Sequence, residues 1–277
     1  MGAAGFRRSI WRQPLDTGEL AGREHHVDLA ENRPCRGSWK PAGAAWRTLR
    51  ASGWLPWQPL VPQQAFADCV VRAVRSLKEA EPTERFGHYL EFGVSRGTSM
   101  ACAYHALRKE GVASDGLVGF DSFEGMPAES SGQGWAPGQF HSTIDATRGY
   151  LRKNGVDLSR VHLVQGWFKD TLNDRTRDRL SISRASLIMV DCDIYSASKE
   201  ALDFCAPLIG NYAVVMFDDW GWREIENEAG QKEAFAEFLR EHPALSARPL
   251  EAYFDHARVF LLTRQGAERQ SSSKAAA

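Results

Sequence analysis

Apolar residues alternate between helical and strand spacing from Gln64 onward. Phe66, Val70, Val74 and Leu77 recur at intervals that place them on one face of a helix. Short, continuous apolar runs predict five buried strands, at residues 88–94, 117–121, 161–166, 187–190 and 213–217. Such alternation is typical of an α/β fold with a mostly parallel sheet.

Further apolar stripes predict the helices between these strands. Their inward residues are Met100, Ala103, Tyr104 and Leu107, then Ala201, Leu202, Cys205 and Leu208, and then Ala234, Phe235, Phe238 and Leu239. Two last apolar runs, 250–254 and 259–263, are separated by only four residues. This short connection predicts an antiparallel hairpin at the end of the sheet.

The first 62 residues differ from the predicted domain at 63–265. They are rich in Gly, Pro and Arg, and they contain five of the nine tryptophans. So much aromatic surface favours packing on the main domain, over its substrate mouth or in a homodimer interface. Disorder of residues 1–35 is the alternative. Residues 266–277 are expected to form a disordered tail.

Composition narrows the function classes. The chain is 43% hydrophobic and 25% charged with a net charge of −1, which is typical of a soluble globular protein and argues against nucleic-acid binding. No apolar stretch approaches the ~20 residues that cross a bilayer, and no signal peptide is evident. The five cysteines form no closely spaced pair. We therefore expect a cytoplasmic protein without a membrane partner.

Four carboxylates follow two of the predicted strands. Asp191 and Asp193 follow one strand, and Asp218 and Asp219 follow the other. If the strands are neighbours, ~4.8 Å apart, these anions repel one another, and a divalent cation would relieve the repulsion. All-oxygen ligation favours Mg²⁺, with Mn²⁺ or Ca²⁺ as alternatives. The alternative is that these acids open a turn or cap a helix.

A second group of residues predicts a cofactor site at the same edge. Residues 91–99 form a glycine-containing turn between a strand and a helix, where backbone and helix N-terminus can approach an anionic group. Asp121 ends the next strand, where an acid can accept hydrogen bonds from ribose hydroxyls. A tight turn and a solvated loop acid are the structural alternatives. Ligands of such sheets bind outside the carboxyl ends of the strands.

Five segments together resemble the macrocin O-methyltransferase family. They are residues 89–99 (YLEFGVSRGTS), 119–127 (GFDSFEGMP), 166–172 (GWFKDTL), 190–196 (VDCDIYS) and 217–220 (FDDW). The resemblance covers residues 64–264. It implies a Rossmann-like class I fold, with a mostly parallel seven-stranded sheet ordered 3-2-1-4-5-7-6 and a terminal antiparallel hairpin. It also implies S-adenosylmethionine as methyl donor, bound Mg²⁺ and a sugar hydroxyl of a glycosylated natural product as acceptor.

The resemblance assigns roles to individual residues. Asp193 is the expected base for proton abstraction, and Asp191, Asp218 and Asp219 are the expected metal ligands. The expected donor-binding residues are Glu91, Phe92, Gly93, Val94, Gly97, Thr98, Ser99, Asp121, Ser122, Gly166, Trp167 and Asp191.

The long segment 122–147 is expected to be a functional lid or disordered. Its Trp135 and Phe140 are suited equally to stacking on an acceptor and to packing within the loop.

Two other classes of function stay open. A nicotinamide-dependent oxidoreductase would share the sheet and Asp121, but it would not need four clustered carboxylates. A non-catalytic S-adenosylmethionine-binding protein would share the whole fold.

Overall fold

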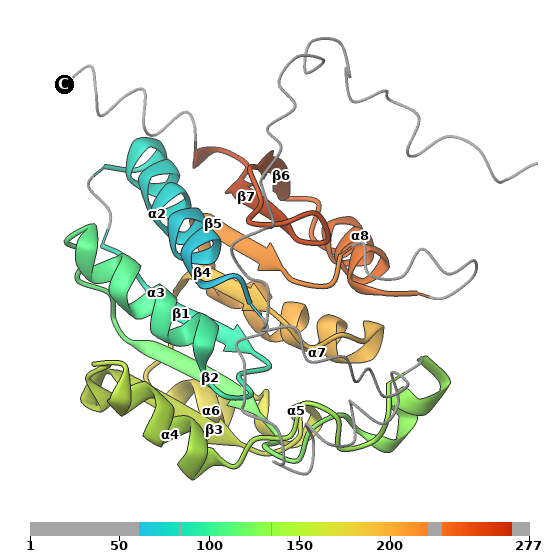
Figure 1. The fold of residues 1–277 in the computed structure, drawn as a ribbon. Coiled ribbons are helices and arrows are strands. Elements are labelled where there is room, and N and C mark those ends of the chain that lie inside the picture. Colours follow the sequence, from blue (N-terminus) through green and yellow to red (C-terminus); the bar gives the residue numbers. More distant parts are fainter. Residues whose placement is uncertain (1–60, 83–84, 134, 221–228, 268–277) are drawn as a thin grey trace, which may run out of the picture. The chain divides into compact units, whose positions relative to one another are not determined.

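The computed structural model describes residues 61–82, 85–133, 135–220 and 229–267. A single seven-stranded sheet runs through this part of the chain (Figure 1). Its strands are β1 His88–Phe92, β2 Leu117–Asp121, β3 Val161–Gln165, β4 Ala185–Val190, β5 Ile209–Phe217, β6 Leu245–Leu250 and β7 Arg258–Arg264.

The strand order is β3-β2-β1-β4-β5-β7-β6, as the sequence resemblance implied. The first five strands pair in parallel, whereas β7 pairs antiparallel with both β5 and β6. The chain reverses its direction along the sheet between β1 and β4, because β2 and β3 lie on one side of β1 and all later strands on the other. This switch point is where open α/β sheets bind ligands.

Helices cover both faces of the sheet. The described helices are α2 Gln63–Ala80, α3 Thr98–Lys109, α4 Ile144–Lys153, α5 Phe168–Thr171, α6 Asp174–Arg179, α7 Tyr195–Cys205 and α8 Gln231–Glu241. Short 3-10 helices are η2 Ala128–Gln133, η3 Leu158–Arg160 and η4 Ala206–Leu208. None of the described helices is both long and apolar enough to cross a membrane.

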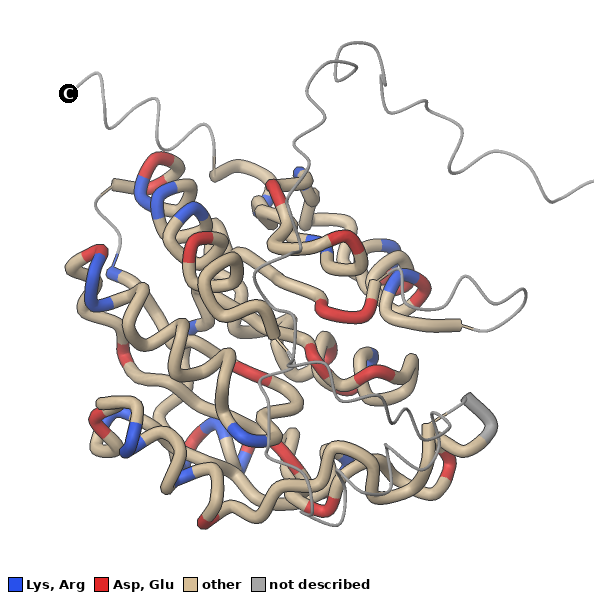
Figure 2. The backbone as a smooth tube through the Cα atoms, in the orientation of Figure 1, with Lys and Arg blue, Asp and Glu red and all other residues tan. Residues whose placement is uncertain are grey.

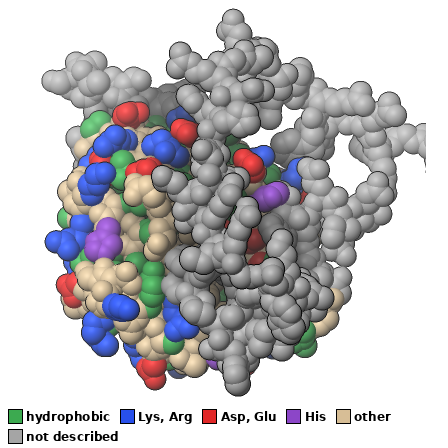
Figure 3. Space-filling model, in the orientation of Figure 1, with side chains coloured by type: hydrophobic (Ala, Val, Ile, Leu, Met, Phe, Trp, Pro, Cys, Tyr) green, Lys and Arg blue, Asp and Glu red, His purple; other side chains and the backbone are tan. Residues whose placement is uncertain are grey.

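Alternation along the strands divides the core in two. On one face, strand residues such as Tyr89 and Leu187 pack against the predicted stripe of α2 and against α3 and α4. On the other face, Leu90 and Ile188 pack against α7 and α8. Successive strand side chains point to opposite faces, so each central strand contributes to both layers. On the α2, α3 and α4 face, Figure 3 shows basic side chains scattered among acidic and uncharged ones.

The predicted terminal hairpin is present, but its first strand was predicted in the wrong place. Strand β6 is Leu245–Leu250, not 250–254, and residues 251–257 form the connection to β7. The apolar run that suggested a strand contains Tyr253 and Phe254, which lie in this connection and not in the sheet. Tyr253 packs edge-on against Phe66 of α2, with ring centroids 5.0 Å apart. Tertiary packing overrides local β-propensity here.

Helix α4 starts within the segment predicted as a lid or disordered. Its N-cap is Thr143, whose side-chain oxygen accepts a hydrogen bond from the Ala146 N–H at 3.2 Å. The Thr cap was a usable sequence signal. The N-terminal extension, apart from residues 61 and 62, and the tail beyond residue 267 lie outside the described residues, so their predicted roles and the domain limits stay predictions.

Gly93 follows β1 at a point where two backbone segments cross. It has φ +88°, and an added Cβ would lie 1.7 Å from the Asp191 carbonyl oxygen. Backbone atoms cannot yield as a flexible side chain can. A residue without Cβ is therefore required between β1 and the end of β4.

We expect Gly93→Ala to lower the free energy of unfolding by more than about 1 kcal/mol, because it combines left-handed strain with a backbone clash. Gly149→Ala is the matched control, since nothing lies within 4 Å of its added Cβ in α4. That change should raise stability by about 0.5–1 kcal/mol. Chemical denaturation measures both, and equal stability of Gly93→Ala and wild type would contradict the close approach.

Candidate active site

A large cavity lies at the carboxyl ends of the parallel strands. Its volume is about 750 Å³, within the range of small-molecule sites. Figure 2 shows acidic positions gathered at this edge of the sheet. Residues from the predicted donor and acid groups line it together: Gly93, Asp121, Ser122, Trp167, Asp191, Asp193, Asp218 and Asp219.

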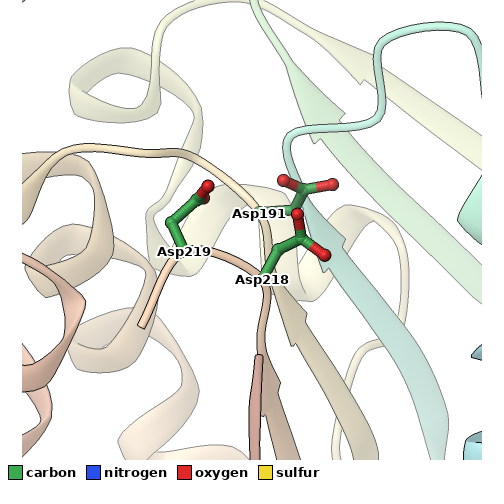
Figure 4. A group of neighbouring side chains, drawn as sticks. All are labelled: Asp191, Asp218 and Asp219. Carbon is green, nitrogen blue, oxygen red and sulfur yellow. The ribbon is translucent and has the colours of Figure 1, made fainter. Parts of the chain in front are cut away.

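Three of these acids form one compact group (Figure 4). Asp191, Asp218 and Asp219 each offer a carboxylate oxygen within 4.8 Å of the others. Backbone hydrogen bonds continue one residue past the ends of β4 and β5 and fix the main chain at two of these acids. The Asp191 N–H donates to the Phe92 carbonyl at 2.9 Å, and the Asp218 N–H donates to the Val190 carbonyl at 3.2 Å. Asp218 and Asp219 both follow the end of β5. Adjacent residues within a strand face opposite ways, so these two acids can share an ion only beyond the strand end.

Burial and mutual repulsion shape the electrostatics of this group. Burial raises the pKa of Asp191 well above its usual value, and the nearby carboxylates of Asp218 and Asp219 raise it further. Burial also raises the pKa of Asp218, although the hydrogen bond from Tyr253 opposes that shift. Three partly buried carboxylates that offer only oxygen donors form a set that suits a hard divalent cation.

Asp193 lies in a strained turn. Its φ is 61°, in the left-handed region that residues other than glycine rarely adopt. The Ile194 N–H donates to the Cys192 carbonyl at 2.7 Å, so Asp193 is the central residue of a three-residue turn. A spacing of two residues would place Asp191 and Asp193 on one face of a strand, but β4 already ends at Val190, so the two acids do not share a strand face. Asp193 lines the cavity because of this turn and not because of its position in a strand.

The Asp121 carboxylate supports the turn after β1. Its Oδ2 accepts hydrogen bonds from the Val94 and Ser95 N–H groups, both at 2.8 Å, and its Oδ1 accepts one from the Phe123 N–H at 2.6 Å. A carboxylate has about four acceptor positions. Roughly one remains for a ligand, fewer than the two ribose hydroxyls that the sequence suggested. Burial raises the pKa of Asp121, and these backbone donors oppose the shift.

Glu91 is fully buried beneath the start of α3. Its two carboxyl oxygens accept hydrogen bonds from the hydroxyls of Tyr89 and Ser99, each at 2.6 Å. Burial raises the pKa of Glu91 to about 7, although both hydroxyls act in the opposite direction. The network ties strand β1 to the first turn of α3. Glu91 supports the glycine-containing turn from below and does not line the cavity.

The other predicted donor-binding residues do not line the cavity; they are Phe92, Val94, Gly97, Thr98 and Ser99 of the segment 91–99, and Gly166 after β3. Phe92 packs in the core below, stacked on Phe120 with ring centroids 5.2 Å apart. Gly97 is the left-handed N-cap of α3.

An apolar wall of the cavity was only partly foreseen. Trp135 and Phe140 contact each other edge-on, with centroids 5.3 Å apart, and pack with Met126 and Ile194. All four side chains line the cavity. The sequence pointed to the two aromatics, but Met126 and Ile194 carry no local signal, because they come from separate loops that meet only in the folded chain.

Solved methyltransferase structures share this fold. The O-methyltransferase NovP matches with a TM-score of 0.57 at 19% sequence identity, over 72% of this chain and 80% of that one. The calicheamicin methyltransferase CalS11 matches with a TM-score of 0.55 at 18% identity, over 83% of this chain and 95% of that one. The strand order and these neighbours show the Rossmann-like fold of class I S-adenosylmethionine-dependent methyltransferases.

The chain belongs to the macrocin-O-methyltransferase family, whose model matches residues 70–246. A relative from Streptomyces olivaceus, 8-demethyl-8-(2,3-dimethoxy-alpha-L-rhamnosyl)-tetracenomycin-C 4'-O-methyltransferase, is 28% identical over 143 residues. That alignment covers 48% of this chain and 53% of the relative, so it spans about half of each protein. The resemblance to the family inferred from the five motifs is confirmed.

The raised pKa of Glu91 predicts a pH-dependent stability. The folded protein retains this proton up to about pH 7, whereas an unfolded glutamate loses it near 4.5. The stabilisation from Glu91 is therefore complete below pH 4.5 and declines as the pH rises to about 7. Glu91→Gln should remove this component, so its stability relative to wild type should rise across that window by up to about 3 kcal/mol. Denaturation of both proteins from pH 4.5 to 8 measures it; parallel curves would contradict the shift.

Proposed function

We propose that this protein is an S-adenosylmethionine-dependent O-methyltransferase that methylates a sugar hydroxyl of a glycosylated small molecule, assisted by a divalent cation. The observation that carries the proposal is a single cavity lined both by the donor-type residues Gly93 and Asp121 and by the acid group at the ends of β4 and β5. Membership of an O-methyltransferase family supports the same reaction.

The donor is proposed to lie across the ends of β1, β2 and β3. The turn at Gly93 lets a ligand approach the backbone, and Asp121 accepts a hydrogen bond from one ribose hydroxyl. Trp167 follows β3 and lines the cavity, and it is the residue proposed to flank the adenine. The Glu91 network keeps the turn and α3 in fixed positions, which reduces the ordering cost on binding.

The acid group fits a divalent cation, with Mg²⁺ as the proposed ion and Asp191, Asp218 and Asp219 as its ligands. Their clustered oxygens and the raised pKa of Asp191 support this, because a cation would compensate the repulsion that burial enforces. When bound, such an ion lowers the pKa of a coordinated alcohol and fixes its orientation.

Asp193 is the proposed general base. It lines the cavity but is not a member of the three-carboxylate group. Its left-handed backbone is the kind of local strain that is found at functional sites. Asp193 would accept the proton of the acceptor hydroxyl as the oxygen attacks the methyl carbon in line with the sulfonium.

The charge of the cavity supports a glycoside acceptor without phosphate groups. Among the described lining residues, seven are carboxylates and one is a lysine; they are Asp121, Glu129, Asp191, Asp193, Glu200, Asp218 and Asp219, with Lys169. A nucleoside diphosphate sugar would bring further negative charge to this surface. The apolar wall around Trp135 suits the ring faces of a sugar or an aglycone. The Streptomyces olivaceus relative is named for methylation of a rhamnosyl compound.

The rival functions lose support at the same site. Neither an oxidoreductase nor a non-catalytic binding protein has need of the three-carboxylate group. Homodimer formation and a cytoplasmic location stay predictions.

Donor binding tests the first half of the proposal. Asp121→Asn should weaken S-adenosylhomocysteine binding by about 1.5–3 kcal/mol, the contribution of one hydrogen bond to a charged group. Calorimetry with S-adenosylhomocysteine and its 2′,3′-dideoxyribose analogue separates this contact from the support that Asp121 gives the loop. Wild type should prefer the hydroxylated ligand, and this preference should be smaller in Asp121→Asn, because the neutral amide oxygen is a weaker acceptor than a carboxylate.

Asp157→Asn is the control for that measurement, because Asp157 caps the 3-10 helix η3 and does not line the cavity. Its donor affinity should match wild type. A preference for the hydroxylated ligand that is as large in Asp121→Asn as in wild type would remove Asp121 from the ribose site. Methyl transfer from labelled donor to a panel of neutral glycosides and nucleoside diphosphate sugars then tests the acceptor; transfer only to the latter would refute the acceptor class.

Two variants separate metal ligand from base. Asp191→Asn should weaken Mg²⁺ binding, and excess Mg²⁺ should partly restore the rate. Asp193→Asn should leave Mg²⁺ binding nearly intact and lower turnover by ~10² to 10⁴-fold, and excess Mg²⁺ should not restore it. Calorimetric Mg²⁺ titration and initial rates across Mg²⁺ concentration measure both. Full activity of chelator-treated wild type would refute the metal mechanism, and metal rescue of Asp193→Asn would reverse the two roles.

A further inference from the structure

Two buried polar side chains from outside strands β4 and β5 contact the Asp218–Asp219 pair. Gln231 is the first residue of α8, and Tyr253 lies in the connection between β6 and β7. Only 1% of Gln231 and 6% of Tyr253 is exposed. Neither was singled out by the sequence, and neither lines the cavity.

The side-chain amide of Gln231 links the ends of both strands. Its Oε1 accepts a hydrogen bond from the Asp219 N–H at 3.0 Å, and its Nε2 donates to the Val190 carbonyl at 3.1 Å and to Asp219 Oδ2 at 3.4 Å. The main-chain donor and acceptor fix which end of the amide is oxygen and which is nitrogen. One side chain therefore orients the Asp219 carboxylate and connects it to the end of β4.

Tyr253 has the corresponding contact with the other acid. Its hydroxyl donates to Asp218 Oδ1. The ring is held edge-on by Phe66, which is fully buried in α2, and contacts Phe254 with centroids 5.2 Å apart. Because these two contacts fix the ring of Tyr253, its hydroxyl is held in one position relative to Asp218. The terminal torsion of an aspartate is otherwise broad, so this bond selects one orientation of the Asp218 carboxylate.

We propose that Gln231 and Tyr253 are positioning residues that orient Asp219 and Asp218 as ligands of the divalent cation. The inference rests on the metal site in the proposed function. Each hydrogen bond engages one oxygen of its carboxylate and fixes the direction of the other. Such outer partners of ligating carboxylates typically change metal affinity 10- to 100-fold when they are removed.

The test compares Mg²⁺ binding by calorimetry in full-length wild type, Tyr253→Phe and Gln231→Met. Tyr253→Phe keeps the packed ring and removes only the hydroxyl, so it should fold normally and bind Mg²⁺ about 10-fold more weakly. Gln231→Met should weaken binding by about 10- to 100-fold. Tyr212→Phe is the matched control, because Tyr212 is equally exposed, at 6%, but lies near the start of β5. Its Mg²⁺ affinity should equal that of wild type.

Thermal unfolding without metal and steady-state rates complete the experiment. A positioning role raises the Mg²⁺ concentration needed for half-maximal rate in both variants, and excess Mg²⁺ restores most of the turnover. Lower unfolding temperatures with unchanged Mg²⁺ affinity would show a purely structural role and overturn the inference, while the proposed function would stand. Failure of wild type itself to bind Mg²⁺ would instead refute the metal site, and the inference with it.

Discussion

The parallel pairing of β4 with β5 is the constraint on which the site depends. Its register opposes Val190 to Phe217, so the acids that follow each strand must lie side by side. At 4.8 Å, the largest separation within the acid group, two ionised carboxylates would repel each other by about 3.5 kcal/mol at an effective dielectric constant of about 20. The fold accepts this cost because every residue of β4 and most of β5 are buried between two helical layers. Hydrophobic packing holds charges together that would otherwise separate.

Backbone strain gathers around the same cavity. Among the described residues, five other than glycine have positive φ, and three of them, Ser95, Phe140 and Asp193, line the cavity. The surrounding contacts hold these conformations: the Ser95 hydroxyl donates to the Phe140 carbonyl at 3.0 Å, and the Thr147 hydroxyl donates to the Ser95 carbonyl. The loop after β2 is thereby tied to the turn after β1. The donor side and the apolar wall form one connected framework, so a ligand on one side meets a preorganised surface on the other.

Local pattern was sufficient for much of the fold. The strands β1 to β5 follow from short continuous apolar runs, and the stripes of α2, α3, α7 and α8 follow from the 3.6-residue period of a helix. The positions of the carboxylates at strand ends follow from where those apolar runs stop. The displaced β6 shows the limit of this reasoning. An apolar run of five residues suits a strand or a packed loop equally well, and only the position of Phe66 in space decides which one Tyr253 joins.

By itself, the sequence determined the α/β class, the strand order through family resemblance, and which carboxylates stand at strand ends, because these properties are carried by short segments. Only the tertiary structure shows that Asp121 accepts hydrogen bonds from three backbone N–H groups. It also shows that Asp193 has a left-handed backbone and that Gln231 and Tyr253 contact the acid pair. The reason is physical. The bonds from Val94 and Ser95 to Asp121, and those that join Gln231 and Tyr253 to the acid pair, link residues 12 to 35 positions apart. Such bonds depend on how the helices and loops pack on the sheet, and no local periodicity encodes that packing.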